Sequence, residues 1–159
     1  MTNTIELPDL SGHTVQYPKY RLAFRPAAYA LIVQDGKLLV VESRQTGKLF
    51  LPGGGVEKGE TMPETLQREL HEETGLEIEI VRFLRFKEFF FYYALEDQGF
   101  HSLLFYYLCR TQDTSLPAPA NLNDADTTNP RWVPVADLKP ADFHTNGDTI
   151  VQLLGELED

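Results

Sequence analysis

Glutamates concentrate between residues 54 and 76 of this chain, close to a single arginine. The residues at issue are Glu60, Arg68, Glu69, Glu72 and Glu73. Carboxylates held this close together repel one another unless a cation lies between them. Carboxylate oxygens are ligands that hard divalent metals prefer, and such metals commonly serve phosphate chemistry. The pattern therefore predicts a divalent-metal site.

A helix is expected to position these side chains. Thr61 is a good N-cap with Glu64 three residues later as its capping-box partner, and Gly75 is a natural stop. The buried stripe of this helix is expected to be Met62, Leu66 and Leu70. The opposite, more solvated side is expected to carry Glu69, Glu72 and Glu73. A lone charge run is more often a solvated helix face, but the flanking Pro52–Gly55 turn and the spacing favour a site.

Residues 54–76 resemble the Nudix box, G-x5-E-x7-R-E-U-x-E-E-x-G-U with U an aliphatic residue, at every fixed position. The resemblance implies an α/β fold, the Nudix-type α/β/α sandwich around a mixed β-sheet. It also implies hydrolysis of a diphosphate linkage in a nucleoside diphosphate derivative, with Mg²⁺ or Mn²⁺. A nucleoside triphosphate, a dinucleoside polyphosphate and a nucleotide sugar all belong to that class.

A nucleotide-sensing Nudix-like module that binds without catalysis is the alternative function. The intact glutamate set argues against it, because a pure binder has no need of a metal cluster. An acidic protein-interaction domain is a second alternative, and it would not require the glycine-rich turn.

The resemblance assigns roles to individual residues. The implied metal ligands are the Gly53 carbonyl, Glu69, Glu72 and Glu73. Glu69 is either a further ligand or the general base, and Arg68 orients a glutamate through a charge-assisted hydrogen bond. The supporting residues are Glu60, Gly54 and Gly75. Some family members take the base from a downstream loop, where the candidates here are Asp124 and Asp126. Aspartates in such loops are commonly turn formers, so both interpretations stay open.

The substrate residues are sought after the box, in the aromatic run 89–93. Tyr92 and Tyr93 fall where the family's dinucleoside polyphosphate hydrolases carry a tyrosine. The proline that marks ADP-ribose hydrolases is absent, since Phe91 stands there. On a strand the two tyrosines point to opposite faces, so at most one lines a pocket. Arg44 is a candidate for a distal phosphate, with a solvated surface charge as the alternative.

Composition limits the partners. The 159 residues carry a formal net charge of −10, which argues against binding to a nucleic acid polymer. No apolar run approaches the roughly 20 residues of a membrane span. The single Cys109 fits a reducing compartment, so we expect a cytoplasmic protein. The resemblance implies a small nucleotide-like diphosphate as its substrate. The sequence leaves open whether the chain forms a homodimer.

Periodicity predicts how the chain is organised. Residues 1–20 are expected to be an irregular extension, and the resemblance implies that residues 21–159 form a single Nudix domain. Asp35-Gly36 predicts a hairpin turn between two strands. The Pro/Ala/Asn/Thr-rich stretch 111–130 is expected to be a loop. The predicted strands cover residues 29–33, 37–42, 77–93, 101–110 and 131–133, and a second helix covers 148–157.

Overall fold

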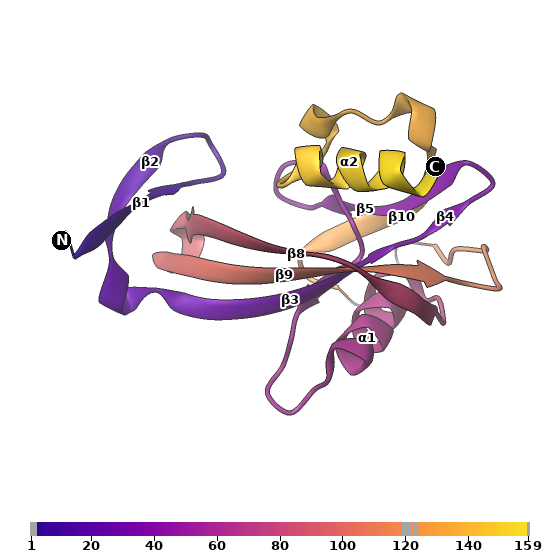
Figure 1. Cartoon of the computed structure of the whole chain (residues 1–159), viewed down its shortest axis with the longest axis horizontal. Helices are drawn as coiled ribbons and strands as arrows, with labels where there is room; N and C mark the ends of the chain where they lie inside the picture. Colours follow the sequence, from indigo (N-terminus) through magenta and orange to yellow (C-terminus); the bar gives the residue numbers. More distant parts are fainter. Residues whose placement is uncertain (1–2, 119–121, 123, 159) are drawn as a thin grey trace.

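Two helices lie on opposite sides of the strands in the computed structural model of the chain, as Figure 1 shows. Helix α1 spans Met62–Thr74 and helix α2 spans Gly147–Glu158. The structure describes residues 3–118, 122 and 124–158. The predicted α/β/α arrangement is confirmed. Of the helices among these residues, none has the length and apolar character that a bilayer span requires.

The strands of the described residues form two larger sheets rather than one. The mixed sheet has the order β7 (Gly53–Gly55), β3 (Ala23–Leu31), β9 (Gln98–Arg110) and β8 (Glu79–Tyr93). In this sheet β3 runs parallel to β9, and the other neighbours are antiparallel. The antiparallel sheet contains β10 (Thr127–Pro134), β5 (Lys37–Ser43), β4 (Val33–Gln34) and β6 (Leu49–Phe50).

The predicted helices and strands are present, but several of them begin or end at other residues than predicted. Asp35 and Gly36 both have positive φ, at 51° and 72°, and they join β4 to β5 as the hairpin motif predicts. Strand β3 begins at residue 23 and β10 at residue 127, earlier than expected. These extra residues are strand because β9 and β5 lie alongside them and satisfy their backbone groups, which local periodicity does not record.

The prediction of irregular structure over residues 1–20 is wrong. Strands β1 (Thr4–Pro8) and β2 (Thr14–Pro18) form an antiparallel hairpin, followed by the short 3₁₀ helix η1 (Lys19–Arg21). Leu7 and Tyr17 are buried in this hairpin. They pack so closely on Gly99 that a Cβ there would lie 2.7 Å from both side chains. The hairpin is ordered by this long-range packing, while the domain division at residue 20 stays a prediction.

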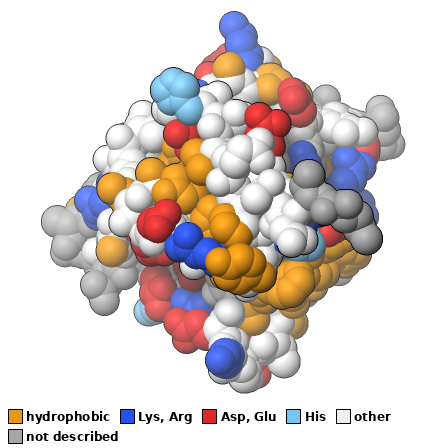
Figure 2. Space-filling model, turned by 90° about the vertical axis from the view of Figure 1, so that its left-hand side faces the viewer, with side chains coloured by type: hydrophobic (Ala, Val, Ile, Leu, Met, Phe, Trp, Pro, Cys, Tyr) orange, Lys and Arg blue, Asp and Glu red, His pale blue; other side chains and the backbone are white. Residues whose placement is uncertain are grey.

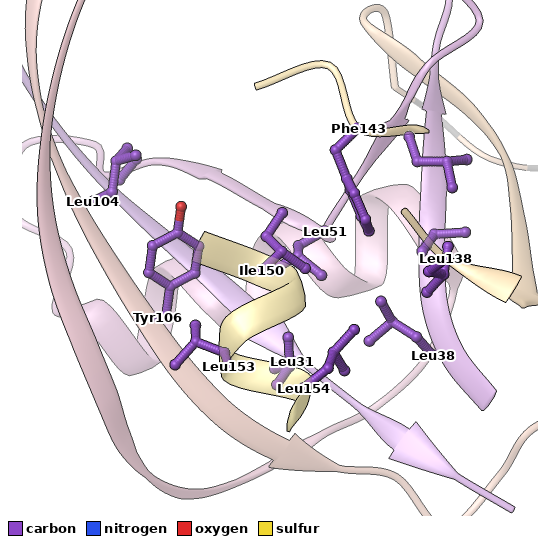
Figure 3. Packing of buried hydrophobic residues seen from close by; sticks show 13 residues of the cluster. Leu31, Leu38, Leu51, Leu104, Tyr106, Leu138, Phe143, Ile150, Leu153 and Leu154 are labelled. Atoms are coloured by element: carbon purple, nitrogen blue, oxygen red, sulfur yellow. The ribbon is translucent and has the colours of Figure 1, made fainter. Parts of the chain in front are cut away.

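A hydrophobic core lies on each side of the mixed sheet. Under α2, Ile150, Leu153 and Leu154 point toward Leu31 and Tyr106, as Figure 3 shows. Under α1, the second cluster contains Ala28, Ala30, Ile32, Leu39, Leu66, Leu70, Leu76, Ile78 and Cys109. Cys109 is a free, buried thiol whose pKa burial raises to about 12, which makes it an inert packing residue. The two cores fix both helices relative to the sheet.

Candidate active site

Helix α1 begins and ends as its sequence predicts. The Thr61 hydroxyl accepts the Glu64 backbone N–H, and the Glu64 carboxylate accepts the Thr61 N–H in return. Gly75 forms the left-handed cap at φ 72°. Leu66 and Leu70 are fully buried against the strands. The helix therefore presents its glutamates from a fixed frame.

Glu73 does not lie on the solvated side of α1, and that expectation is wrong. The side chain is 3% exposed, because this part of the helix faces β7 and β10. Its carboxylate accepts the Gly53 N–H at 2.7 Å and the Thr127 hydroxyl at 2.9 Å. Burial raises the pKa of Glu73 well above its ordinary value, and the nearby Glu69 adds to the rise. A buried carboxylate of this kind is costly to ionise without a cation beside it.

Arg68 ties the loop before α1 to the helix. Its Nε and one terminal nitrogen donate to the two Glu60 oxygens at 2.7 and 2.9 Å. The other terminal nitrogen donates to Glu69 at 2.9 Å and to Glu72 at 3.4 Å. The Arg68 hydrogen bonds lower the pKa of Glu60 to about 2. Arg68 thus orients Glu69 while Glu60 holds Arg68.

Two glycines of β7 let the backbone approach these carboxylates. Gly53 has φ 143°, a conformation that a residue with a Cβ rarely adopts. A Cβ at Gly54 would lie 2.7 Å from a Glu69 oxygen. The glycine turn therefore permits close contact between β7 and the glutamate face of α1.

Three carboxylates converge beside this turn. Glu69, Glu72 and Asp124 each offer one oxygen, and these oxygens lie within 4.8 Å of one another. Burial raises the pKa of Glu69 to about 7, against the opposing hydrogen bond from Arg68, and the charges of Glu72 and Asp124 raise it further. An all-oxygen donor set of this kind suits Mg²⁺ or Mn²⁺, so the side chains present fit such an ion.

The two predicted loop carboxylates have different surroundings. Asp124 accepts the backbone N–H groups of Asp126 and Thr127, as in a turn, and also belongs to the three-carboxylate cluster. Asp126 is exposed. Arg44 packs against this loop, since its Nε donates to the Asp124 carbonyl at 3.3 Å. Asp124 is the loop residue that the structure brings to the glutamates.

A cleft of about 570 Å³ runs from these carboxylates to an aromatic end. Glu69, Glu73 and Arg44 line one end of it. Alternate residues of β8 line the other, namely Phe89, Phe91 and Tyr93. Tyr92 points to the opposite face, where its hydroxyl donates to Asp97 and its ring packs on Tyr17. The structure therefore selects Tyr93 over Tyr92 as a cleft residue.

Several residues that line the cleft could not be predicted from the sequence. Arg25 on β3 lines the cleft, and its pKa is raised chiefly by its proximity to Tyr29, with smaller effects of Glu69 and Asp126. Leu10 arrives from the tip of the β1–β2 hairpin and Phe100 from β9. The His144 ring packs against Phe50 in a tilted arrangement, with ring centroids 4.6 Å apart and an interplanar angle of 30°. No local motif marks these residues, because only the strand pairing brings them together.

Comparison with known proteins agrees with this geometry. The model of the NUDIX domain matches residues 23–154. The chain belongs to the Nudix family. A solved NUDIX hydrolase from Nitrosomonas europaea superposes on this Nudix domain with a TM-score of 0.66, covering 86% of this chain and 89% of that one at 23% identity. At that identity the likeness shows the fold.

Curated Nudix relatives resemble parts of the chain. An ADP-ribose pyrophosphatase from Methanocaldococcus jannaschii is 44% identical over 63 residues, covering 36% of this chain and 37% of that protein. The human 8-oxo-dGDP phosphatase NUDT18 is 33% identical over 113 residues, covering 70% of this chain and 32% of that protein. The chain spans less than half the length of these curated relatives.

Proposed function

We propose that this Nudix protein hydrolyses a diphosphate linkage in a nucleoside diphosphate derivative, with Mg²⁺ or Mn²⁺ as its cofactor. One observation carries the proposal: Glu69 and Asp124 of the carboxylate cluster line the same cleft as the aromatic side chains of β8. The carboxylate end suits a metal and the phosphates, while the aromatic end suits a base. A nucleotide has both parts in one molecule.

The metal would be held by the carboxylates at the end of α1 and by the neighbouring loop. The proposed ligands are Glu72, Glu73, Asp124 and the carbonyl oxygen of Gly53, with Glu69 beside them as either a further ligand or the general base. When bound, such an ion neutralises phosphate charge and lowers the pKa of a coordinated water. The carboxylate cluster and the buried Glu73 support this assignment, because a cation would relieve the repulsion within the cluster and would offset the cost of ionising a buried carboxylate.

Glu69 is the proposed general base. Arg68 donates to one of its oxygens at 2.9 Å and so restrains its orientation within the cleft. A positioned base of this kind removes a proton from the attacking water. Asp124 stays an alternative, because it belongs to the same cluster.

Two arginines of the cleft would bind phosphate oxygens directly. Arg25 and Arg44 both line the cleft that Glu69 lines. A guanidinium presents several N–H donors in one plane, which matches phosphate oxygens. Positive side chains beside the carboxylates would hold a polyphosphate against the proposed metal site.

The relatives support the substrate class. The Methanocaldococcus protein is named for ADP-ribose and the human protein for 8-oxo-dGDP, and both compounds are nucleoside diphosphate derivatives. A nucleoside triphosphate, a dinucleoside polyphosphate and a nucleotide sugar fit the same two-ended cleft. These compounds share a diphosphate linkage, and only experiment distinguishes which of them is the substrate.

A substrate screen tests the function. Purified protein is incubated with ADP-ribose, UDP-glucose, diadenosine tetraphosphate and the common nucleoside triphosphates, with Mg²⁺, with Mn²⁺ or with EDTA, and the products are identified by chromatography. We expect metal-dependent cleavage of at least one nucleotide into two phosphorylated products. Binding without cleavage under every condition would establish the nucleotide-sensing alternative, and cleavage of inorganic pyrophosphate alone would overturn the substrate class.

A further inference from the structure

Ser102 is a polar residue in an unusual place on the cleft floor. It lies on β9 and is 0% exposed. Among the described residues, its hydroxyl is the buried side-chain polar group that lacks a hydrogen-bond partner. Burying an unpaired hydroxyl costs free energy, because the hydrogen bonds to water are lost without replacement. Such a group in a folded protein calls for an explanation.

The strand register directs this hydroxyl into the cleft. Ser102 pairs with Arg25 of β3 on one side and with Phe89 of β8 on the other. Residues paired across a sheet point to the same face, and both neighbours line the cleft. Phe100 and Leu104, two residues before and after Ser102, also line it. The hydroxyl thus lies where the charged Arg25 on one side meets the apolar side chains of Phe89, Phe100 and Leu104.

Aromatic rings surround the floor beyond Ser102. Phe89 stacks on Phe91 with centroids 5.4 Å apart and an interplanar angle of 19°. Phe91 stacks on Phe100 at 5.2 Å and 24°. Leu10 and Leu95 line the cleft at this end. Figure 2 looks onto the hairpin end of the molecule and shows hydrophobic side chains gathered there among charged ones. Flat apolar rings next to the Ser102 hydroxyl suit a planar heteroaromatic ring with polar atoms at its edge.

We propose that Ser102 is a specificity-determining residue whose hydroxyl forms a hydrogen bond with the polar edge of the substrate's nucleobase. The inference rests on the proposed function, which puts the diphosphate at the carboxylate end and so puts the base at the aromatic end. The rings of β8 and β9 contact the base without distinguishing its edge. The Ser102 hydroxyl supplies a directional hydrogen bond, which distinguishes one base edge from another.

The test compares Ser102→Ala with the wild-type chain. Steady-state kinetics are measured on the diphosphates of adenosine, guanosine, cytidine and uridine, and on base-free ribose 5-diphosphate. We expect KM to rise roughly three- to tenfold for the preferred nucleotide, the effect of one lost hydrogen bond. The preference among bases should flatten, and kcat and the base-free reaction should be unchanged. The melting temperature should not fall, because the hydroxyl has no protein partner to lose.

Ser43→Ala is the matched control for stability. Ser43 is also buried and lines the same cleft, but its hydroxyl accepts the backbone N–H groups of Gln45 and Thr46. This variant should melt at a lower temperature than Ser102→Ala. A lower melting temperature for Ser102→Ala with unchanged base preference would show a structural role and overturn the inference. An equal KM change on the base-free compound would overturn it as well.

Failure of the proposed function gives a different result. In that case the wild-type chain cleaves none of the diphosphates, whatever residue 102 is. Binding of the corresponding nucleoside monophosphates, measured by calorimetry, then still reports on Ser102. Weaker binding by Ser102→Ala with a flattened base preference would support the base contact, and identical affinities of both chains would reject it.

Discussion

The two ends of the cleft differ in how the chain builds them. The carboxylate end comes from β7 and α1, which are close in sequence, with Asp124 added from a loop. The aromatic end is assembled from β8, β9 and the tip of the N-terminal hairpin. The first end is fixed by local turns, caps and ion pairs. The second depends on which strands lie beside one another.

This difference bears on what each end can do. The carboxylate end is held by hydrogen bonds through Arg68, Glu60 and Gly53, so its charges have little freedom. Such preorganised charge serves the transition state. The aromatic end is a surface of rings and leucines, and a substrate that we propose binds there would contact it equally before and during the reaction. We therefore expect changes at the carboxylate end to lower kcat and changes at the aromatic end to raise KM.

Glu69→Gln should have the largest effect. The substitution keeps the shape of the side chain and removes the proton acceptor, so kcat should fall by roughly 10²–10⁴ if Glu69 is the base. Little change is expected in KM. Single-turnover assays with saturating Mg²⁺ measure the chemical step directly.

Asp124→Asn and Asp126→Asn are the controls for this prediction. Asp126 is exposed and lies outside the carboxylate cluster, so its replacement should leave kcat nearly unchanged. Asp124 belongs to the cluster, so its replacement tests the loop alternative. If Glu69→Gln keeps nearly full activity while Asp124→Asn loses it, the base lies in the loop.

Much of the carboxylate end could be predicted from the sequence, because the helix and the turn that carry its glutamates are local features. The cap at Thr61, the stop at Gly75 and the spacing of the glutamates are visible in the residues themselves. The prediction from the sequence misplaced Glu73, because a carboxylate side chain favours water unless tertiary contacts bury it. The hydrogen bonds from Gly53 and Thr127 that hold Glu73 come from β7 and β10.

The aromatic end could be predicted only in part. Period-two alternation on β8 placed Tyr92 and Tyr93 on opposite faces but did not say which face was the cleft. That choice follows from the pairing of β8 with β9, which brings Phe89 beside Ser102. The hairpin was missed because its order comes from packing on Gly99, far away in sequence. Contacts between distant segments are absent from local patterns.

Glu73→Gln should produce the next largest effect and should separate binding of metal from folding. If Glu73 is a ligand, activity should fall roughly 10–100-fold, the range seen when groups that support a metal are removed. Without metal the variant should melt at an equal or higher temperature, because it no longer buries an ionisable carboxyl. The increase in melting temperature on adding millimolar Mg²⁺ should shrink. An unchanged Mg²⁺ response would assign Glu73 a bracing role only.

Tyr93→Ala should mainly raise KM, since Tyr93 lines the cleft. Loss of a stacking ring should weaken nucleotide binding about tenfold, with a small change in kcat. Tyr92→Ala is the matched comparison, because that ring packs on Tyr17 and its hydroxyl bonds Asp97 outside the cleft. The Tyr92→Ala substitution should lower the melting temperature and leave KM unchanged. Equal kinetics for the two variants would remove Tyr93 from the base-binding surface.

Leu10→Ala should have the smallest effect and tests whether the hairpin belongs to the aromatic end. Leu10 is 39% exposed and lines the cleft, so its truncation removes apolar contact with the substrate and little folding energy. KM for nucleotides should rise roughly two- to fivefold, with the melting temperature unchanged. Leu7→Ala, at a fully buried position of the same hairpin, should instead cost roughly 2–5 kcal/mol of stability. If Leu10→Ala leaves KM unchanged while Leu7→Ala destabilises the fold, the hairpin supports the sheet and takes no part in binding.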